Sequence, residues 1–232
     1  MTENGKSEPE VTVLIAAYNE GLVIGAVVRD ALAAVPSCEV LVVDDGSTDD
    51  TQAVSAAAGA RVLRLDTNVG KGAAIRRGIP EIRGDIVVLI DGDGQDDPGE
   101  IPQLLEALRP GVDLVVGSRF KGHFDPGAIT TMNKGGNRFL TSVVNLLFST
   151  ALTDTQAGFK AVRADTFRAV NLSANRFDIE VDLLLGVLRS GGNVVEVPVR
   201  RAPRPHGESR LSSFPDGARI FRRIVSRRLA AG

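Results

Sequence analysis

Short runs of apolar, β-branched residues alternate with amphipathic segments along the first half of the chain. The apolar runs predict five strands, at residues 11–17, 38–44, 60–66, 85–91 and 113–119. The segments between them predict helices at about 20–35, 49–58, 70–83 and 98–109. Strands that are apolar on both faces and joined by helical crossovers are typical of parallel sheets. The pattern therefore predicts an α/β fold with a mostly parallel sheet flanked by helices.

The second half of the chain has a less regular pattern. It predicts a helix at about 133–152, another at about 178–190, a strand at 193–199 and a terminal helix from about 215. A loop rich in Pro and Arg lies between the last two, at 200–213. No linker and no internal repeat interrupts the pattern, so we expect a single domain. Residues 1–10 are polar and acidic and are expected to form a disordered tail.

Composition places the chain among ordinary globular proteins, with 43% hydrophobic and 24% charged residues. Cys38 is the single cysteine, which rules out an internal disulfide and is typical of a reducing compartment. The longest uncharged, mostly apolar run covers residues 139–153. A membrane-spanning helix needs about 20 such residues, so this run is too short to cross a bilayer. We therefore expect a cytoplasmic protein that is soluble or attached to the membrane face.

Charge is unevenly distributed, although the net charge is only −2. Residues 199–232 hold nine Arg against Glu208 and Asp216, for a local net charge of +7. Within 214–232, five apolar residues recur at helical spacing and Arg residues flank them, as in amphipathic helices that lie on anionic membranes. The same apolar stripe could instead pack on the domain, with the Arg face in solvent. Either way, the basic tail indicates an anionic partner.

Polar motifs follow the predicted strands, reading "AAYNE", "VDDGSTDD", "IDGDGQDD" and "GSRF". Parallel sheets bind ligands beyond the carboxyl ends of their strands. Asp91 and Asp93, two residues apart, are expected to project to the same side, and Gln95 can follow. Two carboxylates and an amide oxygen suit Mg²⁺ or Mn²⁺ better than zinc. The alternative is an ordinary Asp/Gly turn.

Two further motifs favour binding of a nucleotide. In "VDDGSTDD", Ser47 or Thr48 can cap the next helix, which leaves Asp44 and Asp45 to accept hydrogen bonds from a base or ribose. In "NVGKGAA", glycines and Lys71 begin a helix, where N–H groups and a cation can meet phosphate. Helix capping alone would also explain these glycines.

Together, "VTVLIAAYNE", "VLVVDDGSTDDT", "NVGKGAA" and "VVLIDGDGQDDP" resemble the inverting glycosyltransferases of family 2, which have the Rossmann-like GT-A fold. Further on, "GSRF", "DTQAGFKAVR", "FDIEVDLLLGVLRSGG" and "VVEVPV" followed by "GESRL" resemble one branch, the polyprenyl- and dolichyl-phosphate sugar synthases. The resemblance runs from residue 11 to about 215. It implies a GT-A domain at 11–213, with a nucleotide-sugar half at 11–120, an acceptor half at 121–213 and a basic amphipathic helix at 214–232.

The resemblance assigns roles on the nucleotide side. It implies that Asp91, Asp93 and Gln95 hold Mg²⁺ or Mn²⁺, which in turn holds the diphosphate of the sugar nucleotide. The residues expected to bind the nucleotide sugar are Ala17, Tyr18, Asn19, Glu20, Asp44, Asp45, Lys71, Asp91, Gly92 and Asp93.

On the acceptor side, a lipid monophosphate is already largely dianionic near pH 7, so it needs cations rather than a general base. The residues expected to bind it are Arg119, Lys134, Asn137, Arg204, Ser209 and Arg210. Lys134 in "NKGGN" stands where relatives often carry Arg, and it holds phosphate as a point charge rather than a fork. Asp182 corresponds to a region where relatives with hydroxyl acceptors place a base; it could equally form a structural helix start or orient a sugar hydroxyl. The catalytic candidates are Asp91, Asp93, Arg119 and Asp182.

The expected reaction is metal-dependent, inverting transfer of a hexose from UDP-glucose or GDP-mannose to a polyprenyl or dolichyl phosphate. Many relatives append transmembrane helices and this chain ends at Gly232 without them, so a soluble acceptor is an alternative. A non-catalytic nucleotide-sugar binding protein is a second alternative, against which stands the complete D-x-D-x-Q motif. No G-x-G-x-x-G follows the first strand, which disfavours dinucleotide binding. No nucleic-acid partner is expected, and a homodimer is compatible with the sequence.

Overall fold

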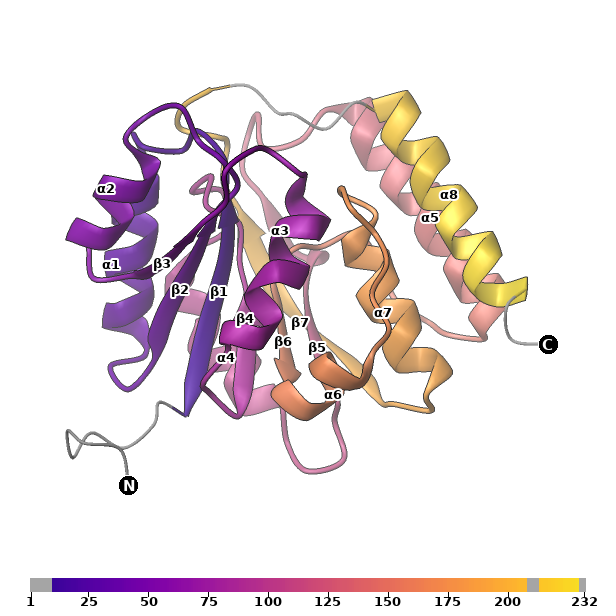
Figure 1. Ribbon diagram of the computed structural model, residues 1–232. Helices are drawn as coiled ribbons and strands as arrows, with labels where there is room; N and C mark the ends of the chain where they lie inside the picture. Colours follow the sequence, from indigo (N-terminus) through magenta and orange to yellow (C-terminus); the bar gives the residue numbers. More distant parts are fainter. Residues whose placement is uncertain (1–9, 208–212, 230–232) are drawn as a thin grey trace.

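A seven-stranded sheet forms the centre of the molecule in the computed structural model, which describes residues 10–207 and 213–229 (Figure 1). The strand order is β3-β2-β1-β4-β6-β5-β7. The strands are β1 (Val11–Ala17), β2 (Glu39–Asp44), β3 (Arg61–Arg64), β4 (Ile86–Leu89), β5 (Leu114–Phe124), β6 (Lys160–Arg163) and β7 (Val194–Arg201).

The sheet is mostly parallel, as the sequence predicted. β1 pairs in parallel with β2 and β4, β2 with β3, and β5 with β7. β6 is the exception, because it runs antiparallel to both β4 and β5. The sequence pattern did not predict β6, because its residues Lys160–Arg163 are not a continuous apolar run and the strand is defined by its pairing with β4 and β5. This short strand lies between β4 and β5 and so joins the strands β1 to β4 to the pair β5 and β7 in one sheet.

Helices cover both faces of the sheet. The α-helices are α1 (Ile24–Ala34), α2 (Thr51–Ala57), α3 (Lys71–Gly78), α4 (Ile101–Ala107), α5 (Thr131–Phe148), α6 (Ala164–Ala169), α7 (Ile179–Arg189) and α8 (Ser213–Leu229). Two 3-10 turns, η1 (Ile79–Glu81) and η2 (Pro98–Glu100), lie beside α3 and α4. The helix α6 directly follows β6 and was also not predicted.

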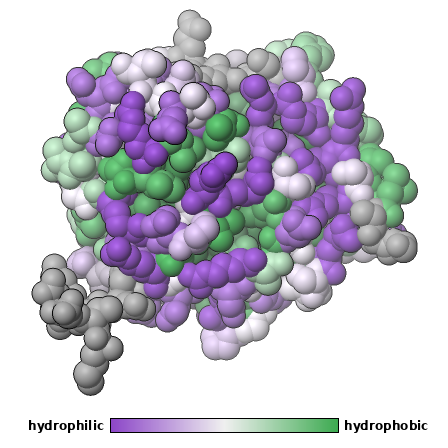
Figure 2. All heavy atoms as spheres, in the orientation of Figure 1, coloured by the Kyte–Doolittle hydropathy of each residue, from purple (hydrophilic) through white to green (hydrophobic). Residues whose placement is uncertain are grey.

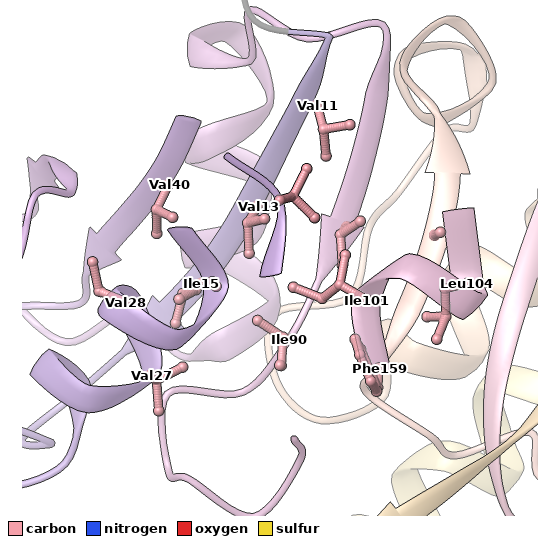
Figure 3. Close-up of a cluster of buried hydrophobic side chains, with 14 of the residues drawn as sticks. Val11, Val13, Ile15, Val27, Val28, Val40, Ile90, Ile101, Leu104 and Phe159 are labelled. Atoms are coloured by element: carbon pink, nitrogen blue, oxygen red, sulfur yellow. The ribbon is translucent and has the colours of Figure 1, made fainter. Parts of the chain in front are cut away.

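Successive residues of the central strands enter two different hydrophobic clusters. Val13 and Ile15 of β1 pack with Ile101 of α4 and with residues of α1 on one face, where Figure 3 shows the interlocking side chains. Leu14, between them, packs on the other face, with Ile75 of α3 and with residues of α6 and α7. This alternation follows from the period of two in a strand, and it explains why the strands are apolar throughout.

The helices α5 and α8 lie side by side as an outer layer next to α7 (Figure 1). Ile220 and Ile224 of α8 are buried in a third hydrophobic cluster, formed with Leu140, Val144, Val181 and Leu185. Arg223 and Arg227 of the same helix form ion pairs at 2.9 and 2.6 Å with carboxylates of or next to α7, namely Asp178 and Asp182. The buried part of the apolar stripe on α8 therefore packs on the domain itself.

None of the helices within residues 10–207 and 213–229 is both long and apolar enough to cross a bilayer.

Candidate active site

The acidic motif lies directly after β4, at the carboxyl edge of the sheet. Gly92 has no room for a side chain, because a Cβ there would lie 2.9 Å from Ile24 Cδ1. Gly94 has a φ of +71°, which favours glycine. The resulting turn brings oxygens of Asp91, Asp93 and Gln95 to 3.9, 3.7 and 3.0 Å from one atom, Nη2 of Arg201. The three predicted metal ligands therefore converge on a single positive charge.

This convergence fits a hard divalent cation. In residues 10–207 and 213–229, no group of three or more His, Cys, Asp or Glu side chains has the geometry of a metal site. Two carboxylates and an amide oxygen would thus need further oxygens, such as those of a diphosphate, and this is the usual way in which proteins hold Mg²⁺. Gln95 is also tied to the end of β7, because its Nε2 donates to Ala202 O at 2.9 Å.

The acidic turn is joined to the segment after β7 by backbone contacts as well. Asp96 and Arg201 form an isolated β-bridge, and Ala202 N donates to Gln95 O at 2.8 Å. The Arg201 guanidinium lies 2.6 Å from Asp96 Oδ2. Arg201 was not singled out from the sequence, because nothing in "VPVRRAPR" distinguishes it from its neighbours. It contacts every acidic residue of the motif except Asp97.

A chain of alternating charges runs from the pocket lining into the interior. Lys71 Nζ lies 2.5 Å from Asp91 Oδ1 and 2.6 Å from Glu180 Oε1, and Lys160 Nζ lies 2.8 Å from Glu180 Oε2. Burial alone would raise the pKa of Asp91, but Lys71 and Arg201 outweigh it and hold this pKa below its usual range. Burial likewise opposes the charge of Glu180, while Lys160 and Lys71 hold its pKa low. Both carboxylates therefore stay ionised near neutral pH.

Asp93 has a different electrostatic environment. Burial and the neighbouring charge of Asp91 raise its pKa. Arg201 partly offsets this rise, and the shortest cationic contact of Asp93 is with Arg204, whose Nη1 lies 3.1 Å from Asp93 Oδ2 and whose Nη2 pairs with Glu20. Arg204 thereby links the loop that follows β1 to the acidic turn. A cation that binds Asp93 must compete with this guanidinium.

A pocket of about 560 Å³ opens over these residues. The predicted nucleotide-sugar residues that line it are Ala17, Tyr18, Glu20, Asp45, Lys71, Asp91, Gly92 and Asp93. Asp45 accepts hydrogen bonds from Val69 N and Gly70 N at 2.8 and 2.9 Å, and burial raises its pKa. This carboxylate fixes the start of α3 against the end of β2.

Two predicted nucleotide-binding residues do not line the pocket. Asp44 is fully buried and accepts from Ser47 N at 2.9 Å and from Arg64 Nη1 at 2.8 Å. Asn19 has a φ of 55° and accepts from Thr48 N at 2.8 Å through its Oδ1. Both side chains hold the loops that shape the pocket.

The predicted acceptor residues divide into three groups. Arg119, Asn137 and Arg204 line the pocket, and Arg119 is held in a fork by Asp154 at 2.7 and 2.8 Å. Lys134 does not line it; its Nζ lies 5.2 Å from the centre of the Phe124 ring. Ser209 and Arg210 lie outside the described residues.

Asp182 is fully buried and does not line the pocket. Its carboxylate accepts from Ser173 N and Ala174 N at 2.8 and 3.0 Å and pairs with Arg227 at 2.6 Å. Glu180, two residues earlier on α7, is the one that lines the pocket. Gln156 also lines it and was not singled out from the sequence.

Residues 12–175 match the family described as Glycosyl transferase family 2, so the chain belongs to this family of enzymes. The sheet and its flanking helices are those of the GT-A fold. Undecaprenyl-phosphate mannosyltransferase of Micrococcus luteus is 37% identical over 87% of each chain. Glycosyltransferase AglJ of Haloferax volcanii is 32% identical over 94% of this chain and 71% of that protein.

Among solved structures, the chain is similar to glucosyl-3-phosphoglycerate synthase from Mycobacterium tuberculosis. The TM-score is 0.76 at 25% identity, covering 94% of this chain and 80% of that one. That crystal contains Mn²⁺, UDP and glucosyl-3-phosphoglycerate. The sequence-based assignment to family 2, the α/β fold and the transferase class are thus confirmed.

Proposed function

We propose that this glycosyltransferase moves a hexose from a nucleoside diphosphate sugar to a polyprenyl phosphate, with inversion at the anomeric carbon. The observation that carries the proposal is the composition of one pocket wall. Asp91 and Asp93 line the same pocket as Arg119, Arg201 and Arg204, an arrangement that would hold a metal–diphosphate next to a second anion. The 37% identity to an undecaprenyl-phosphate mannosyltransferase supports the lipid phosphate as acceptor.

On the donor side, Asp91, Asp93 and Gln95 would hold Mg²⁺ or Mn²⁺, which neutralises the leaving diphosphate when bound. The Mn²⁺ and UDP in the similar synthase support this assignment. Tyr18 and Asp45 line the part of the pocket where the nucleoside would lie.

On the acceptor side, the attacking phosphate oxygen carries its own charge, so the protein's task is to position it. Arg119 suits this role because Asp154 fixes its guanidinium at the pocket wall. Glu180 is poorly suited to act as a base, since two lysines bind it and hold its pKa low. The charges of the pocket thus favour a phosphate acceptor over a hydroxyl.

The outer layer offers a surface for the membrane that would carry such an acceptor. We define the apolar ridge as the large hydrophobic residues exposed on α5 and α8, which are Met132, Phe139, Leu146, Phe214, Phe221 and Leu229. Figure 2 shows hydrophobic side chains at the right-hand edge, where α5 and α8 lie in Figure 1. Arg222 and Arg228 are exposed on α8. Apolar groups flanked by cations suit an anionic membrane face.

A soluble phosphorylated acceptor is the second candidate. It is favoured by the similar synthase, which was also crystallised with phosphoglyceric acid. Both acceptors offer a phosphate to the same arginines.

Transfer assays decide between the two acceptors. UDP-glucose and GDP-mannose are each supplied with Mn²⁺, once with a short-chain polyprenyl phosphate in detergent and once with 3-phosphoglycerate. We expect a sugar–lipid product from one donor. Product from 3-phosphoglycerate alone would favour the second candidate, and no product from any combination would contradict both.

A further inference from the structure

The side-chain oxygen of Gln156 is buried in the pocket wall without a hydrogen-bond partner. Over residues 10–207 and 213–229, two buried side-chain polar atoms lack such a partner, Gln156 Oε1 and Asp96 Oδ2. Asp96 Oδ2 has an ionic one, since Arg201 Nη1 lies 2.6 Å away. The amide nitrogen of Gln156 is used, because it donates to Thr155 Oγ1 at 2.9 Å. The oxygen of Gln156 is therefore an unsatisfied acceptor.

Buried acceptors are nearly always paired in native proteins, because an unpaired one loses its bonds to water without compensation. An orphaned acceptor in a pocket wall is explained when a ligand supplies the missing donor. Gln156 lines the pocket, so a ligand can reach the wall at this residue.

The neighbours of Gln156 place it between the two proposed substrates. Two residues later, Gly158 lies next to a proposed metal ligand, because a Cβ there would lie 3.0 Å from Asp91 Oδ2 and 3.2 Å from Lys71 Nζ. Two residues earlier, Asp154 holds Arg119, the proposed acceptor cation. The transferred sugar must lie between the diphosphate and the acceptor, which is where this segment runs.

The chemistry of the substrates indicates which group donates the missing hydrogen bond to Gln156 Oε1. An ionised diphosphate and an ionised acceptor phosphate carry no hydrogen-bond donors, and the metal ion is already assigned to Asp91, Asp93 and Gln95. Hydroxyl groups of the sugar are donors. We propose that Gln156 Oε1 accepts a hydrogen bond from one hydroxyl of the transferred hexose and so helps to select that sugar. This inference rests on the proposed function.

Binding measurements on Gln156→Met test it, because Met has a similar volume and no acceptor. Calorimetry with Mn²⁺ compares UDP with UDP-glucose, and GDP with GDP-mannose. We expect the variant to bind the preferred sugar nucleotide about 3- to 10-fold more weakly and the bare nucleoside diphosphate within about twofold of the wild type. The midpoint of thermal unfolding should stay the same or rise, since an unpaired buried acceptor is removed.

Deoxy analogues of the preferred sugar nucleotide identify the hydroxyl. The loss caused by Gln156→Met should disappear for the one analogue that lacks the recognised hydroxyl and persist for the others. Gln103→Met is the matched control, because Gln103 bonds Pro198 O on the surface and lies outside the pocket. It should leave all these affinities unchanged.

The outcomes separate this inference from the proposed function. An equal loss for the nucleoside diphosphate and its sugar conjugate, or a lowered unfolding midpoint, would overturn the role of Gln156 and indicate a structural one. A wild-type protein that binds the sugar nucleotides but transfers to no acceptor would contradict the proposed function alone. Failure of the wild type to bind any of them would overturn both.

Discussion

Lys71 Nζ lies 2.5 Å from Asp91 Oδ1 and 2.6 Å from Glu180 Oε1, at the junction of the two halves of the chain. Lys71 begins α3, and Glu180 lies in the first turn of α7. The lysine that the sequence assigned to phosphate is thus the counter-ion of a proposed metal ligand. A metal ion at Asp91 would compete with Lys71 for this carboxylate and leave the lysine freer to meet a diphosphate.

Replacing Asp93 by Asn should abolish Mn²⁺-dependent binding of the sugar nucleotide and lower turnover by about 100-fold or more. Burial and Asp91 disfavour the charge of Asp93, so its removal should not lower the unfolding midpoint. Calorimetry, transfer assays and thermal unfolding measure the three quantities. Asp97→Asn is the control, since Asp97 accepts from Gly99 N outside the pocket. Unchanged turnover in Asp93→Asn, or full wild-type activity in excess chelator, would contradict the metal site.

Replacing Arg204 by Gln should strengthen binding of Mn²⁺ to the nucleotide-free protein several-fold. The reason is competition, because the Arg204 guanidinium lies 3.1 Å from Asp93 Oδ2 and repels a second cation there. Transfer to the acceptor should fall at the same time, since a proposed phosphate-binding cation is lost. Electron paramagnetic resonance of free Mn²⁺ gives the affinity. Arg200→Gln, which removes a surface pair with Asp125, is the control. Weaker Mn²⁺ binding in Arg204→Gln would refute the competition.

Replacing Lys160 by Met should lower the free energy of unfolding by about 3 kcal/mol at pH 7, because it leaves Glu180 with less compensation for its burial. Glu180 has a lowered pKa in the folded state, so its ion pairs stabilise the fold above its unfolded pKa of about 4.3 and are lost as the pH falls. The difference in the free energy of unfolding between wild type and variant should therefore become smaller below about pH 4. Urea titrations at several pH values measure it.

Lys121→Met is the control for this comparison, because Lys121 is 44% exposed in its 3.3 Å pair with Glu196. Its loss should cost under about 1 kcal/mol. If the difference in unfolding free energy between wild type and Lys160→Met does not depend on pH, the loss of stability comes from packing and not from the ion pair.

Replacing Phe139 and Leu146 together by Ser should weaken co-sedimentation with anionic vesicles by about tenfold or more, if the apolar ridge enters the membrane. Both side chains are exposed, at 60% and 81%, so the unfolding midpoint should hardly change. Ile224→Ala is the contrasting variant: Ile224 is fully buried, so it should cost about 3 kcal/mol of stability. If the double substitution leaves vesicle binding unaffected, the apolar ridge does not enter the membrane.

The sequence predicted those features that depend on local pattern. The strands β1, β2 and β4 were predicted because each is a continuous apolar run. β6 was not, because its pairing with β4 and β5 depends on contacts distant in the chain. Asp91 and Asp93 were identified as a pair because their spacing alone brings them together.

Partners across the fold could not be predicted in the same way. Glu180 and Asp182 are two residues apart on a helix, so they point in different directions, and no local signal says which one lines the pocket. Arg201 is one of nine Arg in its region, and its contact with the acidic turn is set by a bridge between residues about a hundred positions apart. The site therefore depends on pairings that only the folded sheet defines.

The bridge between Asp96 and Arg201, with the bond from Ala202 N to Gln95 O, bears on protein engineering by recombination. Segments 91–97 and 200–204 are far apart in the sequence, yet each is the other's hydrogen-bonding partner. A chimera with a related transferase should thus inherit both from the same parent. A crossover placed between them, at any point of the intervening stretch, would mix two sets of partners at the proposed active site.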